Sequence, residues 1–228
     1  MCGRYTLGNP DPQTLQRRFE LRHRESLRSE PRFNLAPTDP VLAIRRTAAG
    51  EREPGMLRWG LVPGRWAESG RPLINARAET IDSQPAFAES FRERRCLMAA
   101  DGFYEWRRDD RGKVPIWFSK PDGEPFAFAG VWAELARADG AVVTSCALAT
   151  CEPNELMRPV HNRMPVVLDP GVESTWLDPE ASLEDLRALL VPAGEDALVA
   201  REVSDLVNSN RNDGPELIAP RPQEQTLF

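Results

Sequence analysis

Residues 114–150, VPIWFSKPDGEPFAFAGVWAELARADGAVVTSCALAT, decide the fold class of this chain. They contain three apolar runs, at residues 114–119, 126–132 and 142–150. The pairs Asp122-Gly123 and Asp139-Gly140 separate these runs, and Asp-Gly is a strong turn signal. Short runs rich in aromatic and β-branched residues between such turns are typical of strands. We therefore expect these three runs to be sheet strands.

The segments on either side of this stretch add both strands and helices. Further strands are expected at residues 2–7, 41–46, 56–62, 96–100 and 164–168. Helices are expected after the Asp11-Pro12 cap, over residues 84–94 and after Ser182. Because these elements alternate irregularly, without βαβ units, the pattern indicates a single α+β domain over residues 1–228. We expect a mixed, mostly antiparallel sheet that forms a curved or barrel-like core with flanking helices, and a polar tail at 221–228 with the composition of a disordered segment.

The composition is that of a globular protein with one core. The 228 residues are 41% hydrophobic, and none of the apolar runs reaches the length of a membrane span. The N-terminus lacks the basic and apolar regions of a secretory signal, so we expect a cytoplasmic protein that touches no membrane. The four cysteines form no CxxC pair, and the two histidines have no zinc-ligand spacing. We expect reduced thiols, no metal and no cofactor.

Charge is distributed unevenly along the chain. Residues 1–120 hold 22 arginines and lysines against 16 acidic residues, a balance of +6, whereas residues 121–228 hold 7 against 19, a balance of −12. Together they make the net charge of −6. Nearly all the positive charge is arginine, whose planar fork suits bidentate phosphate contacts, so a local basic groove is compatible with an acidic chain. Charge alone does not distinguish such a groove from ordinary solvated arginines.

Cys2 is the residue whose chemistry depends most on its position. Its side chain is small enough for removal of the initiator Met1, which would leave a free α-amine two carbons from a thiol. An α-amine has a pKa of about 7.7–8.0, so a useful fraction is an unprotonated nucleophile near neutral pH. The amine can form an imine with an aldehyde, and the thiol can then close a five-membered thiazolidine ring. An internal cysteine lacks this amine; the alternative is that Cys2 is an incidental second residue.

Three further clusters place reactive side chains beside apolar ones. Asn75 and Arg77, in the run LINARAET, offer an amide next to an anion-binding guanidinium. Glu105, in DGFYEW, lies between aromatic residues that could desolvate its carboxylate and raise its pKa toward acid–base use. His161, in VHNRMP, carries the usual proton-transfer group at neutral pH. Taken singly, each cluster is equally compatible with a structural role.

Taken together and in this order, the four clusters resemble the SRAP family, named for SOS response-associated peptidases and also described as abasic-site processing proteins. Supporting stretches are RFNLAP at residues 32–37, LRWGLVP at 57–63 and VSDLVN at 203–208. The resemblance spans most of the chain. It implies a DNA-damage-response protein that binds single-stranded DNA at abasic sites and crosslinks to the ring-opened deoxyribose through Cys2. It also implies a thiol autopeptidase that removes the leading methionine, with lyase-like chemistry.

The resemblance implies a role for each matched residue. Asn75 would position the sugar and Cys2, Glu105 would assist proton transfers at the amine, and His161 would donate a proton as the sugar ring opens. The residues that match DNA contacts are Arg4, Arg77 and Arg163, as phosphate contacts, and Trp66, as an aromatic that stacks against bases near the lesion. The run around Trp66, PGRWAESGRP, departs from the commoner family versions in length and composition.

Two other functions use the same residues. The main alternative is an N-terminal-nucleophile amidohydrolase or thiol peptidase, in which the Cys2 thiol attacks an amide and the α-amine or His161 acts as base. The other is a non-enzymatic reader of modified bases or single strands, in which the cysteine is structural. A covalent adduct with abasic single-stranded DNA that depends on Cys2 would distinguish the crosslinking function from both alternatives.

Overall fold

A closed ring of five strands forms the core of the computed structural model, which describes residues 2–22, 27, 29–63, 72–110, 112–136 and 139–221. The ring strands are β3 (Pro40–Arg46), β4 (Arg52–Trp59), β6 (Arg95–Ala100), β9 (Phe126–Ala136) and β10 (Val142–Cys151). They follow the order β10-β4-β3-β6-β9, and β9 pairs back onto β10. Only the β10–β4 pair is parallel. Closure joins the strands that would otherwise be edges, which leaves a barrel-like core.

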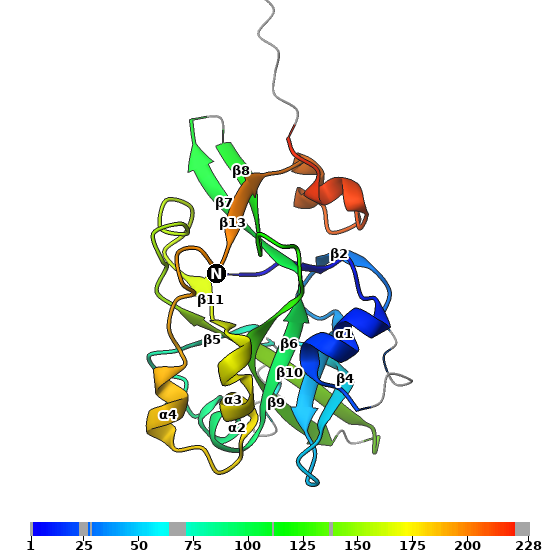
Figure 1. Ribbon diagram of the computed structural model, residues 1–228, viewed down its shortest axis with the longest axis vertical. Helices are drawn as coiled ribbons and strands as arrows, with labels where there is room; N and C mark the ends of the chain where they lie inside the picture. Colours follow the sequence, from blue (N-terminus) through cyan, green and yellow to red (C-terminus); the bar gives the residue numbers. More distant parts are fainter. Residues whose placement is uncertain are drawn as a thin grey trace, which may run out of the picture.

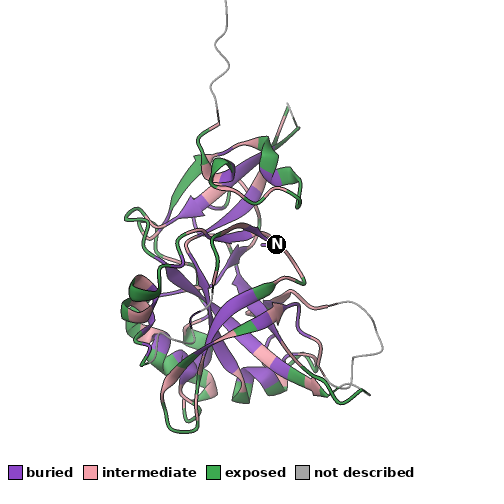
Figure 2. Ribbon diagram, turned by 90° about the vertical axis from the view of Figure 1, so that its right-hand side faces the viewer, coloured by how far each residue is buried: buried purple, intermediate pink, exposed green. Residues whose placement is uncertain are grey.

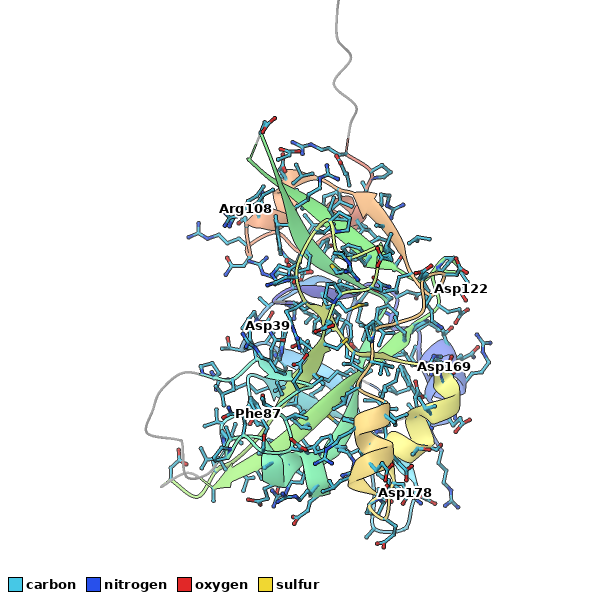
Figure 3. All side chains as sticks on the ribbon, turned by 90° about the vertical axis from the view of Figure 1, so that its left-hand side faces the viewer. Asp39, Phe87, Arg108, Asp122, Asp169 and Asp178 are labelled. Atoms are coloured by element: carbon cyan, nitrogen blue, oxygen red, sulfur yellow. The ribbon has the colours of Figure 1, made fainter. Side chains whose placement is uncertain are left out.

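A second sheet of five antiparallel strands packs against this ring. Its order is β13-β8-β7-β1-β2, and its strands are β1 (Tyr5–Leu7), β2 (Arg32–Leu35), β7 (Gly102–Asp109), β8 (Gly112–Ser119) and β13 (Val199–Glu202). Figure 1 shows this sheet above the ring, with the N-terminus of the chain between the two. In Figure 3, Arg108 marks the β7–β8 hairpin at one end of the molecule and Asp178 the opposite end. The first residues of the chain therefore lie where the two sheets meet.

Aromatic packing fixes that junction. Tyr5 on β1 is fully buried, and its ring lies edge-on to Trp59 and Phe128 of the ring strands, at centroid distances of 5.1 and 5.5 Å. Phe103 on β7 adds a contact to Phe128 at 5.9 Å. Pairs of this geometry stabilise a core by about 0.5–1.5 kcal/mol each beyond their buried area. The chain is thus anchored three residues after Cys2.

Short elements complete the domain. Three short strands are β5 (Asn75–Arg77) and β11 (Met164–Pro165), which pair with β10, and β12 (Val167–Leu168), which pairs with β9. The helices are α1 (Pro12–Phe19), α2 (Ala88–Glu93), α3 (Glu173–Leu177) and α4 (Leu183–Ala188), with 3-10 helices η2 (Pro170–Val172), η3 (Asp205–Asn208) and η4 (Pro215–Ile218). Figure 2 shows that buried residues follow the strands, whereas exposed residues gather on the helices and outer turns. Within the described ranges, no helix is long and apolar enough to cross a membrane.

The expected class, a single α+β domain with a mostly antiparallel, barrel-like core, is confirmed. The Asp11 cap is also confirmed, because its carboxylate accepts from the backbone N–H of Thr14 at 2.8 Å. The strand expected at residues 2–7 is wrong in its first half, since regular pairing begins only at Tyr5. The helix expected at 84–94 is regular only from Ala88.

Four strands were not expected from the sequence: β2, β5, β7 and β13. β7 ends in the polar run EWRRD, which hides its period of two. It is nevertheless held over its whole length by eight register pairs with β8. Residues 222–228 of the expected tail lie outside the described residues.

Candidate functional site

Cys2 lies in the junction between the two sheets and is completely buried. Its thiol donates to the carbonyl oxygen of Arg4 across 3.7 Å, and the backbone N–H of Tyr104 donates to the same oxygen at 3.0 Å. Burial raises the pKa of the Cys2 thiol far above its ordinary value, and the nearby charge of Glu105 raises this pKa further. The thiol is therefore protonated at neutral pH.

Asn75 contacts the Cys2 backbone directly. The parallel pairing of β5 with β10 sets Asn75 opposite Leu148. From there its Nδ2 donates to the carbonyl oxygen of Cys2 at 3.0 Å. Its Oδ1 is buried and has no hydrogen-bond partner among the described residues. Because buried acceptors are nearly always paired, this oxygen is suited to a donor that substrate binding or processing brings to Cys2.

Glu105 reaches the same junction from β7. Tyr5 pairs with Phe103, and the hydrogen bond from Tyr104 to Arg4 continues this ladder toward Gly3 and Glu105. Glu105 is only 4% exposed.

The aromatic neighbours of Glu105 in sequence do not cover it, contrary to the sequence-based expectation. Successive side chains of a strand point to opposite faces, so Glu105 shares a face with Phe103. Tyr104 and Trp106 instead pack together in a separate cluster with Val203 and Val207. The burial of the carboxylate therefore comes from the core side of β7.

Three other sequence-predicted residues, Arg77, His161 and Arg163, line an open pocket of about 580 Å³. Its lining residues are Arg77, Glu79, Thr80, Glu152, His161, Asn162 and Arg163. Cys2, Asn75 and Glu105 do not line it, so the structure brings the predicted residues together as two groups. β5 connects the groups, because Asn75 and Arg77 are two residues apart and share one face of the strand.

His161 is held by its own loop. Its backbone N–H donates to the carbonyl oxygen of Met157 at 3.0 Å, and its ring Nδ1 accepts from the backbone N–H of Arg163 at 3.0 Å. The carbonyl oxygen of Arg163 lies 3.2 Å from the same Nδ1, so the Arg163 backbone can contact this nitrogen whether or not it carries a proton. The backbone of Arg163 therefore fixes the orientation of the ring.

Arg163 forms a bidentate ion pair with Glu79. Nη1 and Nη2 of Arg163 donate to Oε1 and Oε2 of Glu79 at 2.5 and 2.9 Å, and Nη2 also donates to the carbonyl oxygen of Thr150. The side chain of Arg163 is 13% exposed and that of Glu79 is 48% exposed. Hydrogen bonds from Arg163 lower the pKa of Glu79. Both terminal nitrogens of this guanidinium therefore already have partners within the protein, whereas its buried Nε has none among the described residues.

Sequence comparison identifies the family to which the chain belongs. The family model described as SOS response associated peptidase (SRAP) matches residues 1–210. The chain belongs to the SRAP family. Among its SRAP relatives, the abasic site processing protein YoaM of Bacillus subtilis is 39% identical over 96% of this chain and 97% of the relative. The abasic site processing protein YedK of Escherichia coli is 29% identical over 96% of this chain and 100% of the relative.

Solved structures show the same fold. A crystal structure of a protein from Bacteroides thetaiotaomicron superposes with a TM-score of 0.82 at 22% identity, over 97% of this chain and 100% of that one. A second, from Bordetella bronchiseptica, superposes with a TM-score of 0.77 at 29% identity, over 89% of this chain and 100% of that one. These solved structures therefore share the fold described above.

The arginines that match SRAP DNA contacts differ in accessibility. Arg77 is exposed at the pocket. Arg4 instead turns inward, where Nη1 donates to Oδ1 of Asn34 at 2.7 Å and to the carbonyl oxygen of Val207 at 3.1 Å. Trp66 lies outside the described residues. Of the three arginines, Arg77 is the one placed to meet a phosphate without exchanging an internal partner.

Sequence reasoning gave no role to the two glutamates of this SRAP pocket. Glu79 could have been found, because it stands four residues after Asn75 in the same run. Glu152 carried no signal, since it reaches the pocket only through the course of the chain after β10. Across the described residues, no group of three or more histidine, cysteine or acidic side chains is arranged to hold a metal ion.

Proposed function

We propose that this SRAP chain senses abasic sites in single-stranded DNA and crosslinks to them through Cys2 after Met1 has been removed. One observation carries the proposal: Asn75 donates to the Cys2 carbonyl through Nδ2, while its buried Oδ1 accepts no hydrogen bond from the described residues. A free α-amine on Cys2, or the hydroxyl of its first adduct, is such a donor. The names of the relatives, abasic site processing proteins, support the substrate class.

The covalent step follows from the two nucleophiles of Cys2. The α-amine attacks C1′ of the ring-opened sugar, where the aldehyde becomes a carbinolamine, and loss of one water leaves an imine. The thiol then adds across the C=N bond: sulfur bonds to C1′, the former C=N π-electron pair takes a proton on nitrogen, and a thiazolidine results. Glu105, buried beside Cys2, would carry protons between these groups. The product is protein plus DNA minus one water.

His161 prepares the substrate in this mechanism. An abasic sugar is mostly a closed hemiacetal, so its aldehyde appears only when the ring oxygen gains a proton and the C1′–O bond breaks. His161 lines the pocket, and its imidazolium form would donate that proton. Arg77 would bind the adjacent phosphate and confer salt-sensitive, sequence-independent affinity.

The protonation state of Cys2 favours this mechanism over a thiol amidohydrolase. A peptidase of that kind attacks with thiolate, and burial beside Glu105 raises the pKa of the thiol. In the crosslinking mechanism the amine attacks first and the thiol adds later, when its proton can pass to the new nitrogen. Slow alkylation of Cys2 by iodoacetamide at neutral pH is expected, and rapid alkylation would favour the amidohydrolase.

The family description as a peptidase fits one further step. Hydrolysis of the Met1–Cys2 bond consumes one water and releases the amine that the crosslink requires. Asn75 and Glu105 lie beside Cys2, and Glu105 would activate the attacking water in place of a Cys2 thiolate, so we include removal of the chain's own methionine in the proposal. Intact mass of the purified protein reports whether it has occurred.

The decisive experiment is incubation of the processed protein with single-stranded DNA that carries one abasic site. We expect an adduct that survives heat and denaturant and whose mass is the sum of both partners minus one water. The adduct should be absent with Cys2→Ala and with intact DNA of the same sequence. Cys146→Ala is the matched control, since Cys146 is an equally buried thiol in β10. Absence of an adduct with the wild-type protein would overturn the proposal.

A further inference from the structure

Glu79 lines the pocket but has no role in the mechanism above. Its carboxylate takes both terminal nitrogens of Arg163, which lies two residues after His161. The pair joins the loop after β5 to the loop after β10, because 84 residues separate its members along the chain. Such an ion pair either keeps Arg163 from binding a DNA phosphate or holds another residue of the pocket in position.

The hydrogen bonds around Arg163 point to positioning. Its Nη2 also donates to the Thr150 carbonyl at the end of β10, so the guanidinium is attached to a ring strand as well as to Glu79. Its own backbone N–H donates to Nδ1 of His161. A side chain held at both terminal nitrogens restrains its backbone, and this backbone contacts Nδ1 of His161 through both its N–H and its carbonyl oxygen, which orients the ring.

We propose that Glu79 is a positioning residue for His161, acting through Arg163. The carboxylate holds the guanidinium against β10, and the Arg163 backbone, which contacts Nδ1, then keeps the His161 ring in a fixed orientation. This inference rests on the proposed function and deepens it, because it assigns a carboxylate in a DNA-binding pocket to the proton donor. In this role Glu79 contributes to the rate of crosslinking and not to the affinity for DNA.

The test compares Glu79→Gln with the control Asp82→Asn. Asp82 lies in the same loop as Glu79, but it pairs with Arg187 of α4 and does not contact Arg163. The control therefore removes a nearby ion pair without affecting the contacts of His161. For Glu79→Gln we expect crosslinking at saturating abasic DNA to slow by about tenfold, a fraction of what a positioned general acid contributes. Affinity for intact single-stranded DNA should not fall, because a negative charge has left the pocket. Asp82→Asn should crosslink at the wild-type rate.

A second readout does not depend on activity. The amide of Arg163 is protected by its hydrogen bond to His161, so its hydrogen exchange should accelerate by about tenfold or more in Glu79→Gln and stay unchanged in Asp82→Asn. The effects of substitutions at Glu79 and Arg163 on the crosslinking rate should also be non-additive. Adding Glu79→Gln to Arg163→Lys should slow crosslinking no further, because Glu79 acts through Arg163.

The outcomes separate the two proposals. An unchanged crosslinking rate in Glu79→Gln, or affinity that falls by the same factor as the rate, overturns the positioning role. Unchanged exchange at the Arg163 amide also overturns it. If the wild-type protein forms no adduct, the proposed function fails, and the exchange measurement still decides whether Glu79 holds the His161 loop.

Discussion

Replacing Asn75 with alanine tests the residue that joins Cys2 to the rest of the site. The variant removes the 3.0 Å hydrogen bond from Nδ2 to the Cys2 carbonyl, and with it about 1 kcal/mol of stability. It also removes the buried Oδ1, which in our mechanism accepts from the charged or developing amine. Such a charge-assisted bond contributes about 1.5–3 kcal/mol, so crosslinking should slow by about 10- to 150-fold.

The assay is single-turnover crosslinking at saturating abasic single-stranded DNA, alongside thermal unfolding. Asn154→Ala is the matched control, because Asn154 is a buried asparagine whose amide donates to the Ala193 carbonyl and accepts from the Met157 N–H, both at 3.0 Å. That variant loses two satisfied hydrogen bonds and should unfold at a lower temperature than Asn75→Ala, with crosslinking unchanged. The reasoning is refuted if folded Asn75→Ala crosslinks within about threefold of wild type, less than the weakest such bond predicts.

The other predictions concern stability, phosphate binding and proton transfer. Glu173→Gln removes a carboxylate that is 1% exposed and that pairs with two largely buried arginines, Arg18 and Arg52. The free energy of unfolding, measured in urea, should fall by about 3–5 kcal/mol. A loss below about 1 kcal/mol, as for an exposed ion pair, would contradict this prediction. Arg77→Ala should weaken binding to any single-stranded DNA and reduce the slope of log affinity against log salt by about 0.7; an unchanged slope removes Arg77 from the DNA contact. His161→Ala should slow crosslinking by about a hundredfold or more while binding to intact DNA is preserved, and an equal loss of both would contradict the proton-donor role.

Local patterns were sufficient for the elements that depend on neighbouring residues. The apolar runs between Asp-Gly turns became β8, β9 and β10, and the Asp11 cap starts α1 as expected. β7 was missed because half of it leaves the core and carries polar residues. Its place in the sheet comes from pairing with β8 and β1, which no local pattern reports.

The chemistry of single residues was also readable in advance. Cys2 was singled out because only a second-position cysteine can gain an α-amine beside its thiol. Asn75, Glu105 and His161 were singled out as reactive groups beside apolar ones. Their grouping was not readable, because it depends on the parallel pairing of β5 with β10 and on the approach of β7 to the first residues of the chain.

The sequence alone thus specified the reactive groups, the family and the fold class, since these follow from residue identity and short-range periodicity. Only the tertiary structure decided which groups share an environment. It buries Cys2 and so keeps its thiol protonated, leaves one oxygen of Asn75 unpaired among the described residues, and joins Glu79 to Arg163 across 84 positions of sequence. Burial and hydrogen-bond direction arise from strand closure and register over long separations, which no local stretch of sequence reports.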